Sequence, residues 1–474
     1  MKKTNNILVF SIFLYLLLGL IKVRFTANQL GFLADDIFFM IYAASGLVFI
    51  LIFFFLKILK YRGSYIIFLA ALFIIFTGFI VQYSIDSRQI TTRSQTEIKN
   101  TGEENQTGMR LNSKYESGVY KKESIVYLAG FLAFLVIITA LSKNVLILYH
   151  RYLLFALFTL VGFFAFVVFS KAGSYGGRFF QNMTPWEIFK ITLSIVIAGY
   201  LYDYGSDLNK TRFGIPVLPV HSTGPLVLLW VTPLVFLVFI HDFGQLLIYS
   251  VLAVIMIFYA SKRFAYIFIS LFILITFTVG ILNFSNYLPG DLKYINKRFD
   301  TWAHFWDKFP AEEEIDSLAF EEKPEYTEWR RDGWQVLNSY FAISEGGVLG
   351  KGFGLGNPNV IPLVKNDFIF AAILEEMGFF GGFLIILFFM IILYEGIKIT
   401  FFSQHQFLKY LSLSLTLIFI IQVFIHIGGV VKFIPLTGVT LPLMSKGGFS
   451  FITSLSIIAL LMAISHFNYL KSRD

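Results

Sequence analysis

The stretch Asp367-Phe-Ile-Phe-Ala-Ala-Ile-Leu-Glu375-Glu376-Met-Gly378 begins an apolar run that extends to about residue 397. A helix of about 20 apolar residues crosses the hydrocarbon core of a bilayer, and this run is long enough to do so. Asp367 is a good N-cap for the helix. Glu376 lies nine residues further on, ~13 Å along the helix axis. A carboxylate at that depth needs a partner, a proton or water, so we expect Glu376 to belong to a functional site or a buried ion pair.

Similar apolar runs recur from one end of the chain to the other. Of its 474 residues, 57% are hydrophobic and 14% are charged, whereas about a quarter of the residues of a soluble domain are charged. The composition therefore predicts an all-α fold, a polytopic helical membrane protein. Twelve spans are predicted, near residues 6–23, 35–59, 64–85, 124–142, 151–170, 185–202, 226–240, 243–261, 264–283, 367–397, 406–430 and 450–467.

The charged residues indicate an orientation and exclude some partners. Cysteine is absent, which excludes disulfides, thiolate nucleophiles and Cys-ligated metals. The net charge of +8 is typical of positive-inside loops in a membrane protein, and we expect no nucleic-acid partner. With both termini cytoplasmic, the short loops rich in Lys and Arg lie inside; Lys22 and Arg24 depart from this pattern. The long segments 86–123 and 284–366 then lie outside.

The two outer segments differ in composition. Residues 86–123 are rich in Ser, Thr, Asn, Glu and Gly and have few aromatic residues, which predicts a flexible outer loop. Residues 284–366 include Trp302, Trp306, Trp329 and Trp334, so part of this loop is expected to pack or to bind a ligand. The acidic stretch 311–328 within it is typical of a solvated insertion.

Two further motifs place charges at the beginnings of spans. Thr184-Pro185-Trp186-Glu187-Ile-Phe-Lys190 has the pattern of a capping box, which explains Glu187 but not Lys190 on the same helix face. Lys190 either snorkels to the surface or belongs to a site, and both interpretations stay open. Asp242, in Ile240-His241-Asp242-Phe-Gly244, is able to cap the next span, but a charge between apolar spans more often marks a cavity.

The segment from Phe433 to Ser450 holds two prolines, three glycines and Lys446 between apolar spans. It cannot form a plain helix, and it predicts a partly re-entrant outer loop that lines a cavity. We also expect Lys190 and Glu376 to share one outward-facing cavity, in direct or water-mediated contact, because each is too costly to face lipid.

Taken in order along the chain, these motifs resemble those of the SEDS family, the FtsW/RodA/SpoVE-like polymerases of cell-wall peptidoglycan. The start of span six resembles Q-P-S-E-x-x-K, the His241 string is similar to P-D-L-G, and the Asp367 string resembles D-F-I-F-x-x-x-x-E-E-x-G. Residues 435–450 resemble P-x-T-G-x-x-L-P-F-x-S-x-G-G-x-S. Arg298-Phe-Asp-Thr-Trp302-Ala-His-Phe-Trp306-Asp307 resembles the opening of the family's catalytic loop, and residues 335–352 resemble its close. Lys446 departs from the family, which usually has Tyr there.

The resemblance implies a core of about ten spans in residues 63–474, with a large catalytic outer loop over 284–366 between spans nine and ten. Residues 1–62 would be an extra N-terminal transmembrane pair. The implied protein is a peptidoglycan glycosyltransferase that polymerises lipid II, with inversion and with undecaprenyl pyrophosphate as leaving group. It would act in cell division or elongation, at the outer face of the bacterial cytoplasmic membrane. Asp307 is the implied catalytic base, with Asp316 and Glu312 as alternatives.

The resemblance also implies a substrate site and partners. The expected substrate-binding residues are Lys190, Glu187, Arg298, Trp302, Trp306, Asp242, Gln335, Glu376, Ser445 and Lys446. The leaving pyrophosphate needs positive charge, from Lys190, Arg298, Lys446 or a divalent cation, Mg²⁺ or Mn²⁺. The family usually pairs with a class B penicillin-binding protein, a transpeptidase, among other divisome or elongasome membrane proteins. A flippase for lipid-linked precursors and a non-catalytic membrane scaffold of the cell-wall machinery stay open as alternatives.

Overall fold

Helices make up most of the chain that the structure describes, as the composition predicts. This computed structural model describes residues 2–30, 36–101, 107–172, 185–206, 211–212, 215–216, 242–265, 267–268, 299, 302–303 and 333–473. The strands in this part of the chain, β1 (Thr211–Arg212) and β2 (Ile215–Pro216), form a two-residue antiparallel pair.

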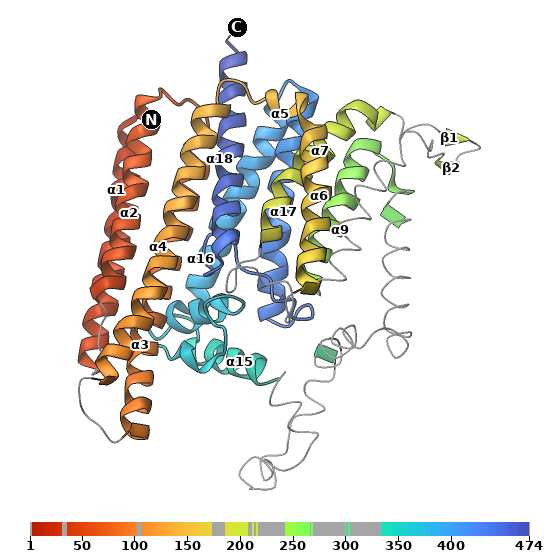
Figure 1. Ribbon diagram of the computed structural model, residues 1–474. Coiled ribbons are helices and arrows are strands. Elements are labelled where there is room, and N and C mark those ends of the chain that lie inside the picture. Colours follow the sequence, from red (N-terminus) through yellow and green to blue (C-terminus); the bar gives the residue numbers. More distant parts are fainter. Residues whose placement is uncertain are drawn as a thin grey trace.

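The long helices lie roughly side by side in one bundle (Figure 1). The described α-helices, including the short α5 and the separate α15, are α1 (Lys2–Gln29), α2 (Asp36–Ile58), α3 (Tyr65–Thr101), α4 (Thr107–Leu141), α5 (Ile147–His150), α6 (Tyr152–Ala172), α7 (Phe189–Tyr204), α9 (Phe243–Ser261), α15 (Trp334–Gly346), α16 (Ile369–Phe402), α17 (Gln406–Val430) and α18 (Gly448–Lys471). Two short 3₁₀ helices, η1 (Pro185–Ile188) and η4 (Pro358–Val360), precede α7 and α16.

Eight of the described helices are long and apolar enough to cross a membrane, namely α1, α2, α3, α4, α9, α16, α17 and α18. They coincide with predicted spans one to four, eight and ten to twelve, and α6 and α7 are helices at the predicted fifth and sixth spans. The predicted seventh span, 226–240, and most of the ninth, 264–283, lie outside the described residues.

The predicted loop over residues 86–123 is wrong in its backbone conformation. Helix α3 continues to Thr101 and α4 begins at Thr107, so both helices extend well past the apolar spans. Adding residues to an existing helix is far easier than nucleating a new one, and Arg, Gln, Glu and Lys are good helix formers. A polar composition excludes a packed core, but it does not prevent a membrane helix from continuing.

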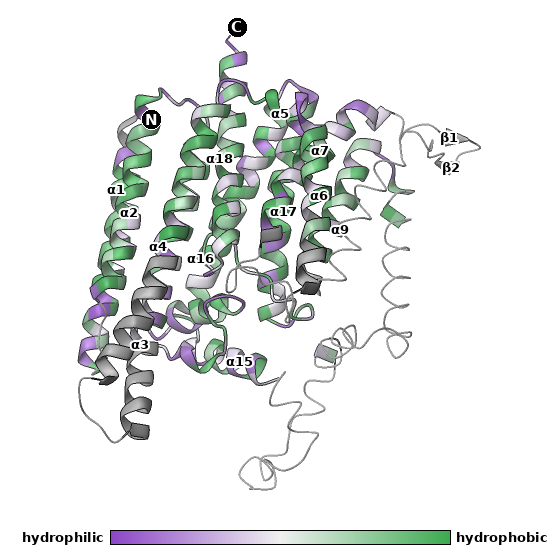
Figure 2. Cartoon of the chain, in the orientation of Figure 1, coloured by the Kyte–Doolittle hydropathy of each residue, from purple (hydrophilic) through white to green (hydrophobic). Residues whose placement is uncertain are grey.

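The two termini lie at the same end of the bundle, and α15 lies at the opposite end (Figure 1). We call these the terminal end and the far end. Apolar residues dominate the middle of the bundle and hydrophilic residues gather toward both ends (Figure 2). This distribution fits a protein whose apolar middle lies in a bilayer.

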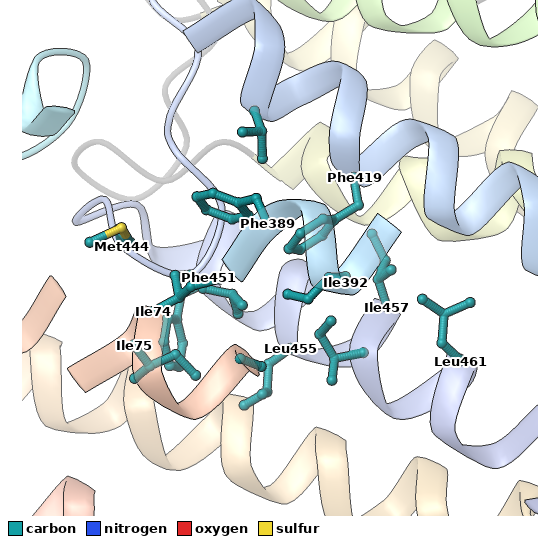
Figure 3. Packing of buried hydrophobic residues seen from close by; sticks show 14 of the residues in the cluster. Ile74, Ile75, Phe389, Ile392, Phe419, Met444, Phe451, Leu455, Ile457 and Leu461 are labelled. Carbon is teal, nitrogen blue, oxygen red and sulfur yellow. The ribbon is translucent and has the colours of Figure 1, made fainter. Parts of the chain in front are cut away.

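Helices α3, α17 and α18 form the centre of the bundle, since most of the apolar stretch of each is buried. In Figure 3, Ile74 of α3, Phe389 of α16, Phe419 of α17 and Leu455 of α18 meet in this core. The rings of Phe389 and Phe419 lie 6.0 Å apart. Because lipid is as apolar as these side chains, such contacts stabilise the bundle through close van der Waals packing.

Helix α16 is interrupted at Gly378, and the interruption is filled by another part of the chain. Gly378 has φ 68° and ψ −173°, a conformation that is essentially restricted to glycine. The loop after α15 supplies the missing hydrogen bonds: Lys351 N donates to Glu375 O at 2.9 Å, and Phe379 N donates to the Gly347 carbonyl at 2.9 Å. Non-helical backbone at this depth is therefore satisfied inside the protein, as a membrane requires.

Glycine is also needed where the two segments touch. A Cβ on Gly378 would lie 2.3 Å from Gly350 N, and one on Gly350 would lie 2.3 Å from the Glu376 carbonyl oxygen. The neighbouring atoms belong to the backbone, so they have little freedom to move away. The pair Gly350 and Gly378 thus allows the contact that positions Glu375 and Glu376.

We expect Gly378→Ala to lower the free energy of unfolding by roughly 1–3 kcal/mol or more, because it adds both backbone strain and a backbone clash. Thermal unfolding in detergent, followed by the loss of monodisperse protein, measures the effect. Gly429→Ala in α17 is the matched control, since its Cβ would meet nothing closer than 3.5 Å. Equal melting temperatures for the two variants would contradict the assigned role of the break.

Candidate active site

A buried lysine at the beginning of α7 is the centre of a polar network that connects α7, α9 and α17. Residues 185–188 form η1, so Glu187 and Lys190 lie one turn apart on one face. The Lys190 ammonium is 0% exposed; it pairs with Glu187 and donates to Gln422 Oε1 of α17 at 2.7 Å. Glu187 Oε1 in turn accepts from Gln245 Nε2 of α9 at 2.8 Å. Lys190 is therefore a buried cation held by charged and amide partners, and it does not snorkel to the surface.

The same network continues into the chain segment between α17 and α18. Residues 431–447 are non-helical, as the prolines and glycines predict. Gln422 Nε2 donates to the carbonyl oxygen of Thr440 at 2.9 Å, and His426 Nδ1 lies 2.7 Å from the carbonyl oxygen of Val439. Polar groups inside α17 thus satisfy backbone oxygens of the irregular segment and hold it against the helix.

Asp242 and Gly244 fit the beginning of α9 against this segment. Asp242 caps the helix, as expected, because its Oδ1 accepts from Gln245 N at 3.1 Å. A Cβ on Gly244 would lie 2.0 Å from Val439 Cγ2, so only glycine permits the observed approach. Gly244 therefore has a packing role beside the cap at Asp242, and His241 lies outside the described residues.

Glu376 and Glu375 form a second buried site beside the break in α16. Both carboxylates are 1% exposed. Glu376 Oε1 accepts from the Ser84 hydroxyl of α3 and from Gly354 N at 3.3 Å, so Glu376 has partners at its depth, as expected. Glu375 Oε1 accepts from Asn357 N at 2.5 Å.

Lys351 brings a positive charge to this second site from the loop after α15. Its Nζ lies 3.4 Å from Glu375 Oε1 and also pairs with Glu345. The hydrogen bond with Glu345 raises the pKa of Lys351 above its ordinary value, burial opposes this, and the charge of Glu375 raises the pKa further. Lys351 therefore stays protonated at neutral pH and compensates the buried Glu375 carboxylate.

A third group of buried charges lies among α3, α4 and the segments that lead into α16 and α18. Asp86 of α3 pairs with Lys365 and lies 3.9 Å from Lys446 Nζ. Lys446 also pairs with Glu123 of α4. Lys446 was expected to bind substrate, and the structure places it between two carboxylates.

The remaining predicted residues have different positions. Trp302 Nε1 donates to the carbonyl oxygen of Lys432 at 3.0 Å, which brings this part of the outer loop to the end of α17. Ser445 Oγ accepts from Leu441 N and donates to the carbonyl oxygen of Asn366, and Gln335 lies half-buried in α15. The alternatives Asp316 and Glu312, and the predicted Asp307, Arg298 and Trp306, lie outside the described residues.

Lys190 and Glu376 bond to different partners, so the direct form of their expected contact is not found among the described residues, and a contact through water stays a prediction. Helix α17 packs against both α7 and α16, so the chain that carries Gln422 lies between them. Lys190 uses its hydrogen bonds on Glu187 and Gln422, whereas Glu376 bonds to Ser84 and Gly354. Spacing along the chain gave no information on which helix would come between two charged spans.

Sequence reasoning missed Gln422, His426 and Gln245, as well as the charged partners Asp86, Glu123 and Lys365. One signal was present: Gln422 and His426 interrupt an apolar span, where a polar side chain is costly unless it has a partner. Asp86 and Glu123 stand at the ends of apolar spans, where an ordinary solvated charge gives the same pattern. The sequence alone does not separate the two cases.

The fold and the site define a polytopic helical membrane protein with buried polar networks at its far end and a broken helix that positions two carboxylates. A family described as "Cell cycle protein", with FtsW, RodA and SpoVE in its name, matches residues 107–470. The chain belongs to this family. Helices α1, α2 and α3 precede the matched residues.

Several known proteins are similar to this chain. The peptidoglycan glycosyltransferase RodA of Mycobacterium leprae (strain TN) is 30% identical over 288 residues, which are 60% of this chain and 56% of the relative. Stage V sporulation protein E of Bacillus subtilis (strain 168) is 27% identical over 291 residues, 60% of this chain and 69% of that protein. The chain thus spans a little over half the length of the mycobacterial relative.

Solved structures share the fold. A structure described as showing the coordination of polymerization and crosslinking by a peptidoglycan synthase complex has a TM-score of 0.54 at 17% identity, over 74% of this chain and 90% of that one. A mutant of the rod shape determining protein RodA from Thermus thermophilus has a TM-score of 0.50 at 14% identity, over 86% of this chain and 99% of that one.

We expect Lys190→Met and Glu187→Gln each to destabilise the protein by roughly 3–5 kcal/mol, because each leaves a buried polar partner uncompensated. The double variant should lose less than the sum of the two. Unfolding in mixed micelles titrated with denaturing detergent measures all three variants.

The exposed pair Arg24 and Asp36 is the control, with side chains 42% and 60% exposed. Arg24→Met should change stability by about 0–1 kcal/mol. Strict additivity of the Lys190 and Glu187 variants would show that the two side chains do not act as a pair.

Proposed function

We propose that this protein is a peptidoglycan glycosyltransferase that polymerises lipid II. The observation that carries the proposal is Lys190, a fully buried cation at the far end of a membrane bundle, held by Glu187 and Gln422. A fixed positive charge in a low-dielectric site stabilises an anionic leaving group more strongly than one in water does. Membership of the family, and relatives named peptidoglycan glycosyltransferase, support the same substrate class.

The proposed reaction joins two lipid II molecules in one displacement. The C4 hydroxyl of one sugar attacks the anomeric carbon of the other, and the bond from that carbon to the pyrophosphate oxygen breaks. Asp307 accepts the hydroxyl proton as general base, and undecaprenyl pyrophosphate leaves with the bonding electron pair. Direct displacement inverts the anomeric centre. Lys190 and Arg298 would balance the charge of the leaving group, and Trp302 and Trp306 would bind sugar or lipid beside it.

We further propose that both termini are cytoplasmic and that the far end faces outward across the bacterial cytoplasmic membrane. The short loops rich in Lys and Arg support this orientation, since Lys57, Lys398 and Lys471 belong to the ends of helices nearest the termini. A class B penicillin-binding protein is the proposed partner among the proteins of division or elongation. The similarity to a peptidoglycan synthase complex supports a partner that cross-links the product.

A divalent cation was one of the expected sources of positive charge for the leaving pyrophosphate, beside Lys190, Arg298 and Lys446. Among the residues that the structure describes, no group of three or more His, Asp or Glu is arranged to hold a metal ion. We therefore assign no step to Mg²⁺ or Mn²⁺, and a requirement for either stays a prediction about this protein.

A flippase and a scaffold differ from a polymerase in what they need from the outer loop. A flippase would use Glu376, Lys190 and Asp242 as a path, and it would have no need of a base beside two tryptophans. A scaffold would tolerate the loss of Asp307 altogether. Polymerisation of lipid II by the purified protein, with and without a class B transpeptidase, separates both from the proposed enzyme.

We expect Asp307→Asn to reduce the rate of lipid II polymerisation by ~10²–10⁴-fold, the usual effect of removing a positioned general base. Gel analysis of glycan strands made by purified protein measures the rate. Asp316→Asn and Glu312→Gln, in the same outer segment, are matched controls that should keep most of the activity. A wild-type rate in Asp307→Asn would exclude Asp307 as the general base. A large loss of rate in either control variant would instead identify that residue as the base.

A further inference from the structure

Two buried carboxylates and two partly buried lysines at the far end form a balanced group of charges that has no part in the proposed reaction. Asp86 is 3% exposed and Glu123 is 6% exposed, so both carboxylates are out of water. Lys365 pairs with Asp86, and Lys446 pairs with Glu123 and lies 3.9 Å from Asp86 Oδ1. Two negative and two positive charges cancel. Each carboxylate would be costly to bury without its lysine.

The two lysines belong to the two chain segments that enter α16 and α18, and these segments are joined directly. Lys446 N donates to the carbonyl oxygen of Lys365 at 2.8 Å, and Ser445 Oγ donates to that of Asn366 at 2.6 Å. The segment after Lys365 leads to Glu375 and Glu376, and the segment before Lys446 is the one held by Gln422. The charge group therefore lies where the two halves of the candidate site meet.

The N-terminal helix pair, α1 and α2, contacts this group of charges through the hydroxyl of Tyr42. Tyr42 of α2 is 0% exposed and donates to Asp86 Oδ2 at 2.9 Å. Gln82 of α3 lies 3.3 Å from the same hydroxyl, and its amide donates to the carbonyl oxygen of Met444. Helix α2, outside the part of the chain that matches the family, thus contacts the carboxylate that holds Lys365.

Helix α1 supports the second buried site in a similar way. A Cβ on Gly354 would lie 3.3 Å from Thr26 Cβ and 3.3 Å from Val23 Cα, so α1 packs closely on this loop. Gly354 N is the donor to Glu376. Both helices of the N-terminal pair therefore touch residues that hold the candidate site, besides covering α3.

We propose that Tyr42, Asp86 and Glu123 are positioning residues, which tie Lys365 and Lys446 to the N-terminal half of the bundle and fix the segments that enter α16 and α18. Lys446 then acts through its ion pair with Glu123 and not as a ligand of pyrophosphate. Glu123 and Asp86 supply the charge that compensates Lys446 in this position. The effect on turnover rests on the proposed function, whereas the fixing of the segments does not.

Two readouts on the full-length protein in detergent or nanodiscs test the proposal. Amide hydrogen exchange reports the order of residues 361–367 and 439–447, and lipid II polymerisation gives kcat and KM. The mild variant is Tyr42→Phe, which keeps the ring. Its matched control is Tyr15→Phe in α1, whose hydroxyl lies 3.2 Å from Thr77 Oγ1, nine residues before Asp86 in α3.

In Tyr42→Phe we expect faster exchange in both segments and a kcat lowered about three-fold or more with a smaller change in KM, while Tyr15→Phe changes neither. Glu123→Lys and Lys446→Glu should each lower kcat about ten-fold or more. The double variant Glu123→Lys/Lys446→Glu should recover most of the loss, because it restores one charge of each sign.

Several results would overturn the proposal. Unchanged hydrogen exchange in both segments of Tyr42→Phe would overturn it. A kcat of the double variant Glu123→Lys/Lys446→Glu that is no higher than that of either single variant would also overturn it. If Tyr42→Phe changes only the melting temperature, and leaves kcat and hydrogen exchange unaltered well below that temperature, then Tyr42 contributes to packing and not to positioning. If the wild-type protein makes no glycan, the proposed function fails, and hydrogen exchange alone still decides whether the charge group fixes the two segments.

Discussion

The docking of residues 347–352 into the break of α16 is the constraint on which the candidate site depends. A membrane interior offers no water to backbone groups, so a helix interrupted at Gly378 has to find other partners. The loop after α15 supplies them, and the glycines at 350 and 378 allow its backbone to come close enough. This contact presents Glu375 and Glu376 to buried donors and joins the outer loop to the bundle.

The buried charges of the far end follow one physical rule. Each is too costly to leave without polar partners in an apolar surrounding, so each has a charged or hydrogen-bonding partner on a different part of the chain. Lys190 joins α7 to α17, Glu376 joins α16 to α3, and Lys446 joins the segment before α18 to α4. The electrostatic cost that makes these residues rare in membranes also makes them link helices that are far apart in sequence.

The fold class, most of the spans and the irregular segment before α18 were predictable, because length, apolarity and helix breakers act locally. The site was predictable only in part. Glu376, Lys190 and Asp242 stood out as charges in costly places, and Gln422 carried a weaker signal as a polar residue inside an apolar span. Asp86 and Glu123, at the ends of spans, had no feature that distinguished them from ordinary solvated charges. The prediction of a loop over residues 86–123 was wrong because a polar composition says little about whether an existing helix continues.

The sequence by itself determined that this protein is a helical membrane protein and which motifs carry its charges, since bilayer thickness and the cost of burying polar groups apply to any chain. Only the tertiary structure decided which charges meet. It put α17 between Lys190 and Glu376, and it placed Lys446 between Asp86 and Glu123. The reason is that a pairing across the bundle depends on how whole helices pack, and helix packing in lipid depends on shapes summed over many residues.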